Sequence, residues 1–340
     1  MPTPDPPAAP QPPQPEPTQP THPEHRRPHA PTRAELEARA QATRADLEAR
    51  AGAAKAQFDA TNEKIQARTG RNLFAAIGIG LGLGALLLAS LFVWKPLFIV
   101  FGGLLVGFAT FELASALRFA GRNLPRAAST VVGLGMLPFA FFWGVEGLWL
   151  SLIVAVVLIT LYRLVELVRP SHRTGTREVL LDVGAGAFVQ VYVAFSAGFY
   201  LALTGSARGE WWTLAGLIIV VFTDVGAYAS GLRFGKHKLA PTISPGKTWE
   251  GFAGSLVVAI VFGAVLGPLM LQQPWWVGAI MGLLLALVGT AGDLTESLIK
   301  RDLGIKDIST WLPGHGGFLD RLDSILPSAA VAYAIYLIFT

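Results

Sequence analysis

Long apolar runs alternate with short polar connections from about residue 72 to the C-terminus. A helix needs about 20 residues to cross the roughly 30 Å of hydrocarbon in a bilayer, and most of the runs have about that length. The pattern therefore predicts an all-α, polytopic transmembrane helical bundle of about nine spans. The nine runs cover approximately residues 72–94, 96–117, 127–144, 147–168, 181–204, 211–232, 249–270, 275–299 and 324–340.

The first 71 residues have a different character. Residues 1–31 hold 13 of the 23 prolines, a composition typical of a disordered tail. The next stretch is charged, and a segment that begins at Thr32 recurs 11 residues later at Thr43, which favours one long helix. We predict a disordered Pro-rich tail at 1–31, a charged cytoplasmic helix at 32–71 and a transmembrane domain at 72–340. The charged helix is interpreted as a solvated spacer, with self-association or membrane binding as alternatives.

Basic residues in the connections predict the orientation. If the tail is cytoplasmic and the spans alternate, the cytoplasmic connections hold fifteen Lys and Arg residues, whereas the outside connections hold only Lys95 and Arg208. Such an excess marks the cytoplasmic side. We expect a cytoplasmic N-terminus, an external C-terminus and a multi-pass protein of the plasma (inner) membrane. The polar start resembles no cleavable signal peptide, so the first run is expected to remain as an anchor.

Composition narrows the chemistry. Only 15% of the residues are charged, against about 25% in a typical soluble domain. The chain has no cysteine, which excludes disulfides, thiolate metal sites and cysteine nucleophiles. Any metal must be held by carboxylates, imidazoles or carbonyls. The net charge of +4 is small, and no nucleic-acid partner is expected.

Ionisable side chains inside a span cost about 2.5–3.5 kcal/mol each by insertion scales, so they ask for an explanation. Asp224 lies near the end of the sixth run, and Asp293 near the end of the eighth. Asp293, Glu296, Ser297 and Lys300 follow the spacing of one helix face and suit a site for metal and phosphate. The alternatives are a solvated helix end, a helix cap or a pair with a lysine of a connection.

Two connections carry further candidates. In the segment from Lys306 to Asp323, three glycines, Gly314, Gly316 and Gly317, let backbone amides approach a phosphate, and Arg321 is a bidentate phosphate partner. In the segment from Ser244 to Gly251, Thr248 is a predicted N-cap, and Lys247 with the helix amides would form an anion site. A Gly-rich turn, or His315 by itself, is weak evidence.

Together these segments resemble a known family. Ser297–Arg301, Lys306–Asp307 and His315–Asp323 resemble, in residue type and spacing, the signature of the phosphatidate cytidylyltransferases, also called CDP-diacylglycerol synthases. The segments Ser244–Gly251 and Asp224–Tyr228 are similar to that family as well. The resemblance covers roughly residues 72–340 and leaves out residues 1–71.

The resemblance implies an enzyme of the bilayer that converts CTP and phosphatidic acid into CDP-diacylglycerol and pyrophosphate. It implies that Asp293 and Asp320 hold a pair of cations, Mg²⁺ being essential and a second cation such as K⁺ an addition, with Glu296 and Asp323 as further candidate ligands. A homodimer is an open alternative to a monomer. The candidate catalytic residues are Lys300, Arg301, Lys306, Asp307, His315 and Arg321. The candidate substrate-binding residues are Asp224, Ser244, Lys247, Ser297, Gly316 and Gly317.

The physical chemistry of the residues agrees with that reaction. Mg²⁺ prefers one or two carboxylates together with substrate phosphates. A phosphate monoester has a second pKa of about 6, so phosphatidate needs no strong general base to become a nucleophile. Candidates for neutralising phosphate charge are Lys247, Lys300, Lys306 and Arg321.

Two alternatives remain open from the sequence. One is a CTP-using relative that acts on another lipid, such as a polyprenol or phytol kinase or a synthase that makes CDP-archaeol. The other is a transporter in which Asp224, Asp293 and Glu296 line a cation or proton path. A transporter should place its polar groups near the bilayer midplane, whereas these motifs cluster in the cytoplasmic connections.

Overall fold

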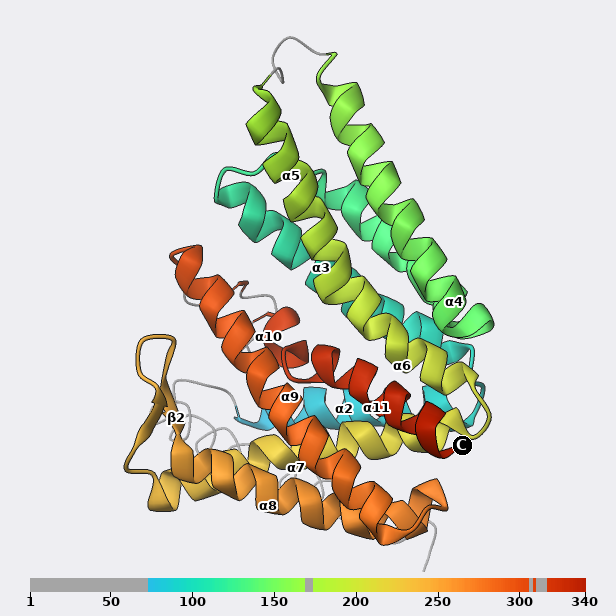
Figure 1. Ribbon diagram of the computed structural model, residues 1–340, viewed down its shortest axis with the longest axis vertical. Helices are drawn as coiled ribbons and strands as arrows, with labels where there is room; N and C mark the ends of the chain where they lie inside the picture. Colours follow the sequence, from blue (N-terminus) through green and yellow to red (C-terminus); the bar gives the residue numbers. More distant parts are fainter. Residues whose placement is uncertain (1–72, 169–173, 306–307, 310–316) are drawn as a thin grey trace, which may run out of the picture. The chain divides into compact units, whose positions relative to one another are not determined.

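The computed structural model describes residues 73–168, 174–305, 308–309 and 317–340. The predicted tail at 1–31 and the charged helix at 32–71 lie outside the described residues. The described residues belong to one compact unit, 64–340, which is almost entirely helical. The helices lie side by side in a bundle (Figure 1), which confirms the predicted fold class. Their bounds, in chain order, are α2 (Leu73–Phe92), α3 (Leu97–Phe119), α4 (Arg126–Glu166), α5 (Thr176–Val189), α6 (Ser196–Gly205), α7 (Gly209–Phe234), α8 (Trp249–Leu266), α9 (Trp275–Asp302), α10 (Leu319–Leu322) and α11 (Ile325–Phe339).

Helix α5 continues into α6, and α10 continues into α11. When each of these pairs is counted as one helix, seven helices of the described part are long and apolar enough to cross a membrane, so this is a multi-pass membrane protein. Helix α4 contains two of the predicted runs, on either side of Gly144, where φ is 61° and ψ is −147°. A methyl group added at Gly147 would lie 2.5 Å from the carbonyl oxygen of Phe139. Residues eight apart in a straight helix are separated by about 12 Å, so the chain folds back on itself at Gly144.

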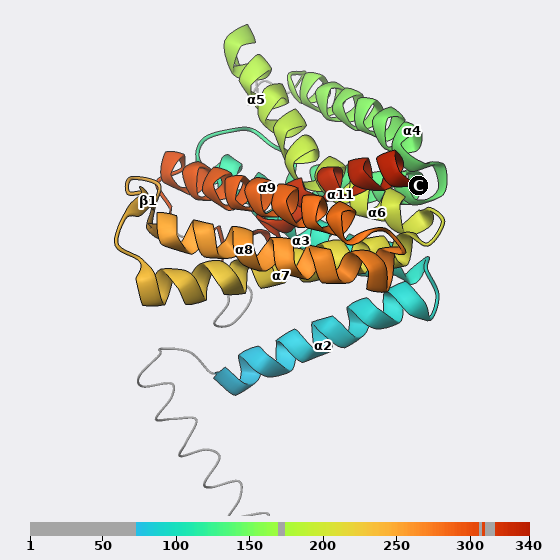
Figure 2. The ribbon, with the colours of Figure 1, turned by 60° about the horizontal axis from the view of Figure 1, so that its bottom comes forward.

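Helices α7, α8 and α9 form a tightly packed group (Figure 2). Small residues permit this packing: a methyl group added at Gly263 would lie 2.1 Å from the carbonyl oxygen of Gly278, and one added at Gly282 would lie 2.0 Å from that of Ala259. In lipid, van der Waals contact between backbones is a main source of helix association, and glycine allows it. The glycines at the contact of α8 with α9 are therefore packing residues.

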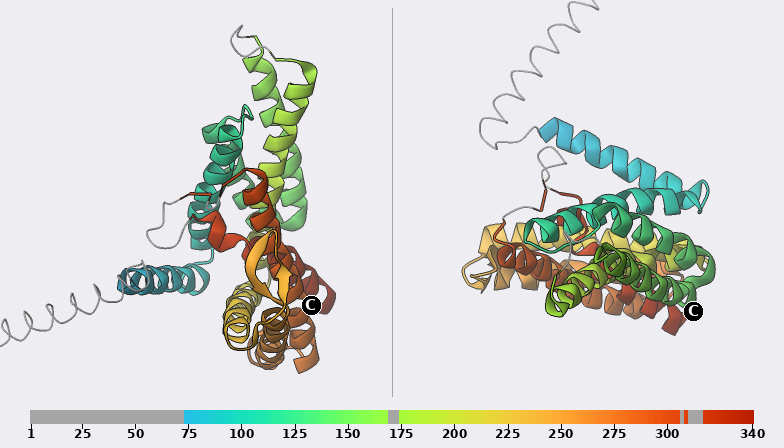
Figure 3. Two further views of the ribbon diagram at one scale, coloured as in Figure 1. Left: turned by 90° about the vertical axis from the view of Figure 1, so that its left-hand side faces the viewer. Right: turned by 90° about the horizontal axis from the view of Figure 1, so that it is seen from above.

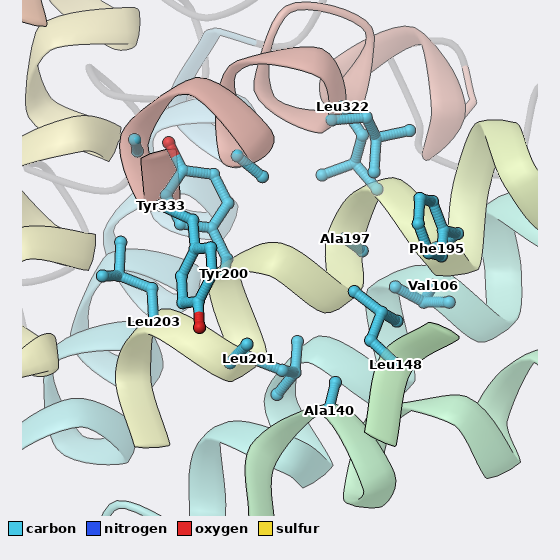
Figure 4. Close-up of a cluster of buried hydrophobic side chains, with 14 of the residues drawn as sticks. Val106, Ala140, Leu148, Phe195, Ala197, Tyr200, Leu201, Leu203, Leu322 and Tyr333 are labelled. Carbon is cyan, nitrogen blue, oxygen red and sulfur yellow. The ribbon is translucent and has the colours of Figure 1, made fainter. Parts of the chain in front are cut away.

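Helix α6 lies at the centre of the buried core. It packs against α4, α7 and α11, and Figure 4 shows its Tyr200 and Leu203 beside Tyr333 of α11. Leu201 and Leu203 are almost fully buried. The helix that leads into α6 contains a π-helical turn, η2 (Gln190–Phe195), and a second one, η3 (Gly267–Leu271), follows α8.

An antiparallel hairpin joins α7 to α8. Its strands are β1 (Lys238–Ala240) and β2 (Ser244–Thr248), and Lys238 pairs with Thr248. The left view of Figure 3 looks at the end of the bundle that carries this hairpin. The sequence predicted a connection here but no strands. The hairpin matters for the site because it directs Lys247 toward α9.

Candidate functional site

Helix α9 carries the polar stripe that the helical spacing predicted. Lys300 Nζ lies 2.5 Å from Glu296 Oε2, one turn earlier, and Ser297 Oγ donates to Asp293 Oδ1 at 3.4 Å. Glu296 is fully buried, while Asp293 and Lys300 keep about a third and a sixth of their side chains exposed (30% and 17%). The stripe therefore runs from the interior of the bundle to its surface.

Lys300 connects α9 to α10. Its Nζ also donates to Asp320 Oδ1 at 3.0 Å, so one ammonium group lies between two carboxylates. The other oxygen of Asp320 accepts the backbone N–H of Gly317 at 2.8 Å. Both oxygens of Asp320 are thus held, and its side chain is only 11% exposed. This arrangement fixes the start of α10 against the end of α9.

The hairpin supplies the second lysine. Lys247 Nζ lies 2.6 Å from Asp293 Oδ2. The next residue, Thr248, caps α8 by accepting the N–H of Gly251 at 3.1 Å, which confirms the predicted N-cap. Lys247 therefore sits directly before a helix start, and Asp293 does pair with a lysine of a connection, as the simpler alternative for that residue proposed.

Three carboxylates interact near this lysine. Asp293 repels both Asp224 of α7 and Asp323, and the last two also interact with each other and with Lys247. Asp323 lies between α10 and α11 and accepts the N–H of Ser324 at 2.7 Å. Carboxylates gathered around a single lysine repel one another, and a cation would relieve that repulsion.

A cavity of about 540 Å³ opens beside these groups. It is formed between α7, β2, α8 and α9 and combines a charged end with an apolar wall. A site of this kind suits a ligand with a charged head and an apolar body. Its lining includes Asp224, Tyr228, Lys247, Thr248, Phe252 and Asp293.

The donor set fits a hard cation. Asp224, Asp293 and Asp323 offer carboxylate oxygens, which Mg²⁺ prefers, and substrate phosphates complete its coordination. Within the described residues no three His, Asp or Glu side chains are already close enough together to hold an ion by themselves. Asp293 and Asp320, the predicted ligands, have different lysine partners, Lys247 and Lys300.

The remaining predicted residues are placed as follows. Arg301 is exposed, and its Nε donates to the carbonyl oxygen of Ile243 at 3.2 Å, next to Ser244 at the start of β2. Arg321 is exposed on α10. Four predicted site residues lie outside the described residues: Lys306, Asp307, His315 and Gly316.

Comparison with known proteins gives a consistent result. The profile of the cytidylyltransferase family matches residues 74–339. A phosphatidate cytidylyltransferase of Mycobacterium bovis is 38% identical over 274 residues, which is 79% of this chain and 90% of that protein. One of Mycobacterium leprae is 38% identical over 277 residues, covering 79% and 88%. One of Brucella suis is 40% identical over 156 residues, covering 46% and 57%.

The chain belongs to the cytidylyltransferase family. The resemblance read from the motifs is therefore confirmed, and this family member is a membrane enzyme of the nucleotidyltransferase class. The matched region begins in α2 and ends in α11, so it contains the whole described bundle and every element that supplies a charged residue of the site. The tail before residue 74 lies outside the match.

Two residues of this cytidylyltransferase were missed by sequence reasoning. Glu112 of α3 is 2% exposed and accepts two backbone N–H groups at the start of α10. The Tyr192 hydroxyl of η2 is buried, has no hydrogen-bond partner among the described residues, and interacts electrostatically with Glu296, Asp293 and Asp323. An acidic residue in the second apolar run was a usable signal for Glu112. No sequence signal marked Tyr192.

Proposed function

We propose that this protein transfers a cytidylyl group from CTP to phosphatidic acid and releases CDP-diacylglycerol and pyrophosphate. Membership of the family and the names of its Mycobacterium relatives support this reaction. The observation that carries the proposal is the surplus of carboxylates around Lys247 at the charged end of a cavity with an apolar wall. The phosphates of the two substrates, together with Mg²⁺, would match the charged end of the cavity. The acyl chains of phosphatidic acid would match its apolar wall.

The chemical step is a displacement at phosphorus. An oxygen of the lipid phosphate forms a bond to the α-phosphorus of CTP, and the bond from that phosphorus to the bridging oxygen of the β-phosphate breaks, so that pyrophosphate leaves. When bound, Mg²⁺ supplies neutralisation of the phosphate charge that builds up on the leaving group. Asp293 and Asp320 are the proposed ligands, with Glu296 and Asp323 as further candidates and K⁺ as the candidate second cation.

The lysines have a distinct role in this scheme. Lys247 and Lys300 each pair with a proposed ligand carboxylate, at 2.6 and 3.0 Å. A cation held by those carboxylates would leave both ammonium groups available to the phosphates of CTP and of the lipid. Charge-assisted hydrogen bonds of this type are about twice as strong as neutral ones. The two lysines therefore position the nucleophile and the leaving group.

The decisive assay uses purified protein in detergent with phosphatidic acid and CTP labelled at either the α- or the γ-phosphate. We expect the α-label to enter lipid, together with release of pyrophosphate, and only when Mg²⁺ is present. A lipid kinase would instead transfer the γ-label and release CDP, so transfer of the γ-label would refute the proposal. Polyprenol and archaeol phosphate serve as competing acceptors, and preference for either one would exclude phosphatidic acid as the main substrate.

Orientation and assembly complete the proposal. We infer that the N-terminus and the site face the cytoplasm across the plasma membrane and that Thr340 faces outside, because of the excess of basic residues in alternate connections. Reporter fusions in the 205–210 connection and at the C-terminus should both read as external, and a cytoplasmic C-terminus would refute the nine-span topology. A homodimer is the assembly to test by cross-linking in membranes.

A further inference from the structure

Glu112 is a buried acid in the middle of an apolar helix. It lies in α3, is 2% exposed, and its partners come from a segment about 200 residues later in the chain. Oε1 accepts the N–H of Phe318 at 3.1 Å and Oε2 accepts the N–H of Leu319 at 2.9 Å. Oε1 also accepts the hydroxyl of Ser309. Burial of an ionised carboxylate is costly unless donors compensate it, so these bonds are what makes Glu112 tolerable here.

The partners of Glu112 flank the Gly-rich segment of the motif. Ser309 precedes that segment, and Phe318 and Leu319 follow it. One side chain of α3 thus fastens both flanks. The neighbouring N–H, that of Gly317, donates to Asp320. Three consecutive amides, at residues 317–319, are therefore held by two carboxylates, and the backbone that carries Asp320 is fixed through Glu112.

The contact with Glu112 also restricts which residue type fits at position 317. A methyl group added there would lie 2.9 Å from Glu112 Oε2 and 3.1 Å from Oε1. The first of these distances is shorter than real Cβ contacts essentially ever are, so the carboxylate must shift to admit any larger residue. The glycine in the motif and the glutamate of α3 are thus physically coupled. Phe108, one turn before Glu112, stacks on Phe318 with ring centroids 4.5 Å apart, which strengthens the same attachment.

We propose that Glu112 is a positioning residue of this enzyme: it holds the start of α10 so that the Asp320 carboxylate stays beside Lys300 and the cation site. The inference rests on the proposed function for its catalytic part. Its structural part, that Glu112 orders residues 317–320, is independent of the substrate.

The test combines Glu112→Gln with a matched control, Asp182→Asn. Glutamine keeps the size but turns one acceptor into a donor that faces a backbone N–H. Asp182 is also a buried acid, 5% exposed, that accepts a backbone N–H, that of Asn123 at 3.0 Å, but it lies at α5, away from the motif. Two readouts are needed: amide hydrogen exchange at 317–320 without substrate, and turnover against Mg²⁺ concentration.

For Glu112→Gln we expect exchange at 317–320 to become about tenfold faster or more, since a buried N–H loses its acceptor. We also expect turnover to fall by a similar factor and half-saturation to need more Mg²⁺. Asp182→Asn should change neither readout, even if it lowers thermal stability. Unchanged exchange in Glu112→Gln, or faster exchange with unchanged turnover and Mg²⁺ requirement, would overturn the inference.

A second pair of variants keeps the test valid if Glu112→Gln does not insert. Gly317→Ala should impair exchange protection and turnover by crowding the carboxylate, whereas the double variant Glu112→Ala with Gly317→Ala should be no worse than Glu112→Ala alone. Additive losses would refute the coupling. If the wild-type protein makes no CDP-diacylglycerol yet the exchange results hold, the proposed function fails and the structural role of Glu112 stands.

Discussion

Two clusters of charged side chains in this bundle differ in how far basic groups compensate their carboxylates. The first surrounds Arg163 of α4, which is 1% exposed. Its Nε donates to Asp182 at 3.0 Å and its guanidinium lies 3.7 Å from Glu166. Asn123 donates its N–H to Asp182 and its side-chain amide to Glu166. The acids, the arginine and Asn123 thus form one network that ties α4 and α5 to the connection after α3.

The second cluster, at the site, is unbalanced. In the described residues its ion pairs involve two lysines, Lys247 and Lys300, and three of the surrounding carboxylates. Asp224 and Asp323 add two further carboxyl groups that interact unfavourably with Asp293. In the first cluster one arginine faces two acids, an excess of one, whereas in the second two lysines face five acids, an excess of three. The larger excess of carboxylates favours a ligand of positive charge. Both clusters contain buried acids, so the excess of carboxylates over basic groups, more than burial, distinguishes the functional cluster.

The largest effect is expected from removing a proposed cation ligand. Asp293→Asn or Asp320→Asn should lower turnover about a thousandfold, since each loses a charge that Mg²⁺ requires. The double variant should be little worse than either single variant, because the two act as one unit. Pyrophosphate release is measured at several Mg²⁺ concentrations, with Asp182→Asn, at a buried acid outside the site, as the control. Near-normal rates in both single variants would show that the site lies elsewhere.

The cluster around Arg163 should respond in stability instead. Arg163→Met leaves the buried Asp182 and the half-buried Glu166 without their guanidinium, which should cost about 3 kcal/mol. The melting temperature in detergent should fall, while the Mg²⁺ requirement of the remaining folded protein stays unchanged. Adding Asp182→Leu to Arg163→Met should recover part of the loss. A shifted Mg²⁺ requirement would mean that the two clusters are coupled.

Replacement of Lys247 tests whether its ammonium group and a cation compete for the same carboxylate, which the cluster around Arg163 should not show. Lys247→Met should slow turnover about thirtyfold, equivalent to about 2 kcal/mol for a charged hydrogen bond. In the absence of nucleotide the same variant should bind Mg²⁺ more tightly, because the ammonium group no longer competes for Asp293. Calorimetry without CTP measures this directly. Weaker Mg²⁺ binding would contradict the proposed competition.

The smallest effect is expected at Tyr192. Its hydroxyl is buried without a partner in the described part of the chain, so Tyr192→Phe should not reduce thermal stability. If that hydroxyl serves a bound phosphate, turnover should fall about threefold, or about 0.7 kcal/mol. Phe188, which stacks on Tyr192 with ring centroids 5.4 Å apart, offers a matched control as Phe188→Leu. A melting point lowered as much as in that control would assign Tyr192 to packing alone.

Regular periodicity made much of the fold and part of the site predictable. The apolar runs anticipated the helices, and the spacing of Asp293, Glu296 and Lys300 anticipated a shared face, since both depend only on local helical geometry. The hairpin was missed because the strand Ser244–Thr248 shows no alternation of apolar and polar residues, contains a proline and a glycine, and has Thr248 as its single β-branched residue. The π-helical turns likewise leave no local pattern.

Contacts between segments far apart in the sequence were the main feature that could not be predicted. Nothing near Glu112 in the sequence reveals that Phe318 and Leu319 need an acceptor, and nothing near Lys247 reveals that Asp293 is its partner. Such pairings depend on how helices pack, which local spacing does not encode. The spacing of motifs supplied the candidate residues, which stay predictions, while the network of contacts among Lys247, Asp293, Lys300 and Asp320 became visible only in the structure.

The fold-back at Gly144 has a consequence for sidedness. If α4 continued straight, its 41 residues would extend about 61 Å, roughly twice the hydrocarbon thickness. The backbone angles at Gly144 belong to a region that is essentially restricted to glycine. This residue therefore sets the parity of the membrane crossings. Each element after it, including the hairpin, the polar stripe of α9 and the motif, reaches its compartment because the chain turns at that one position.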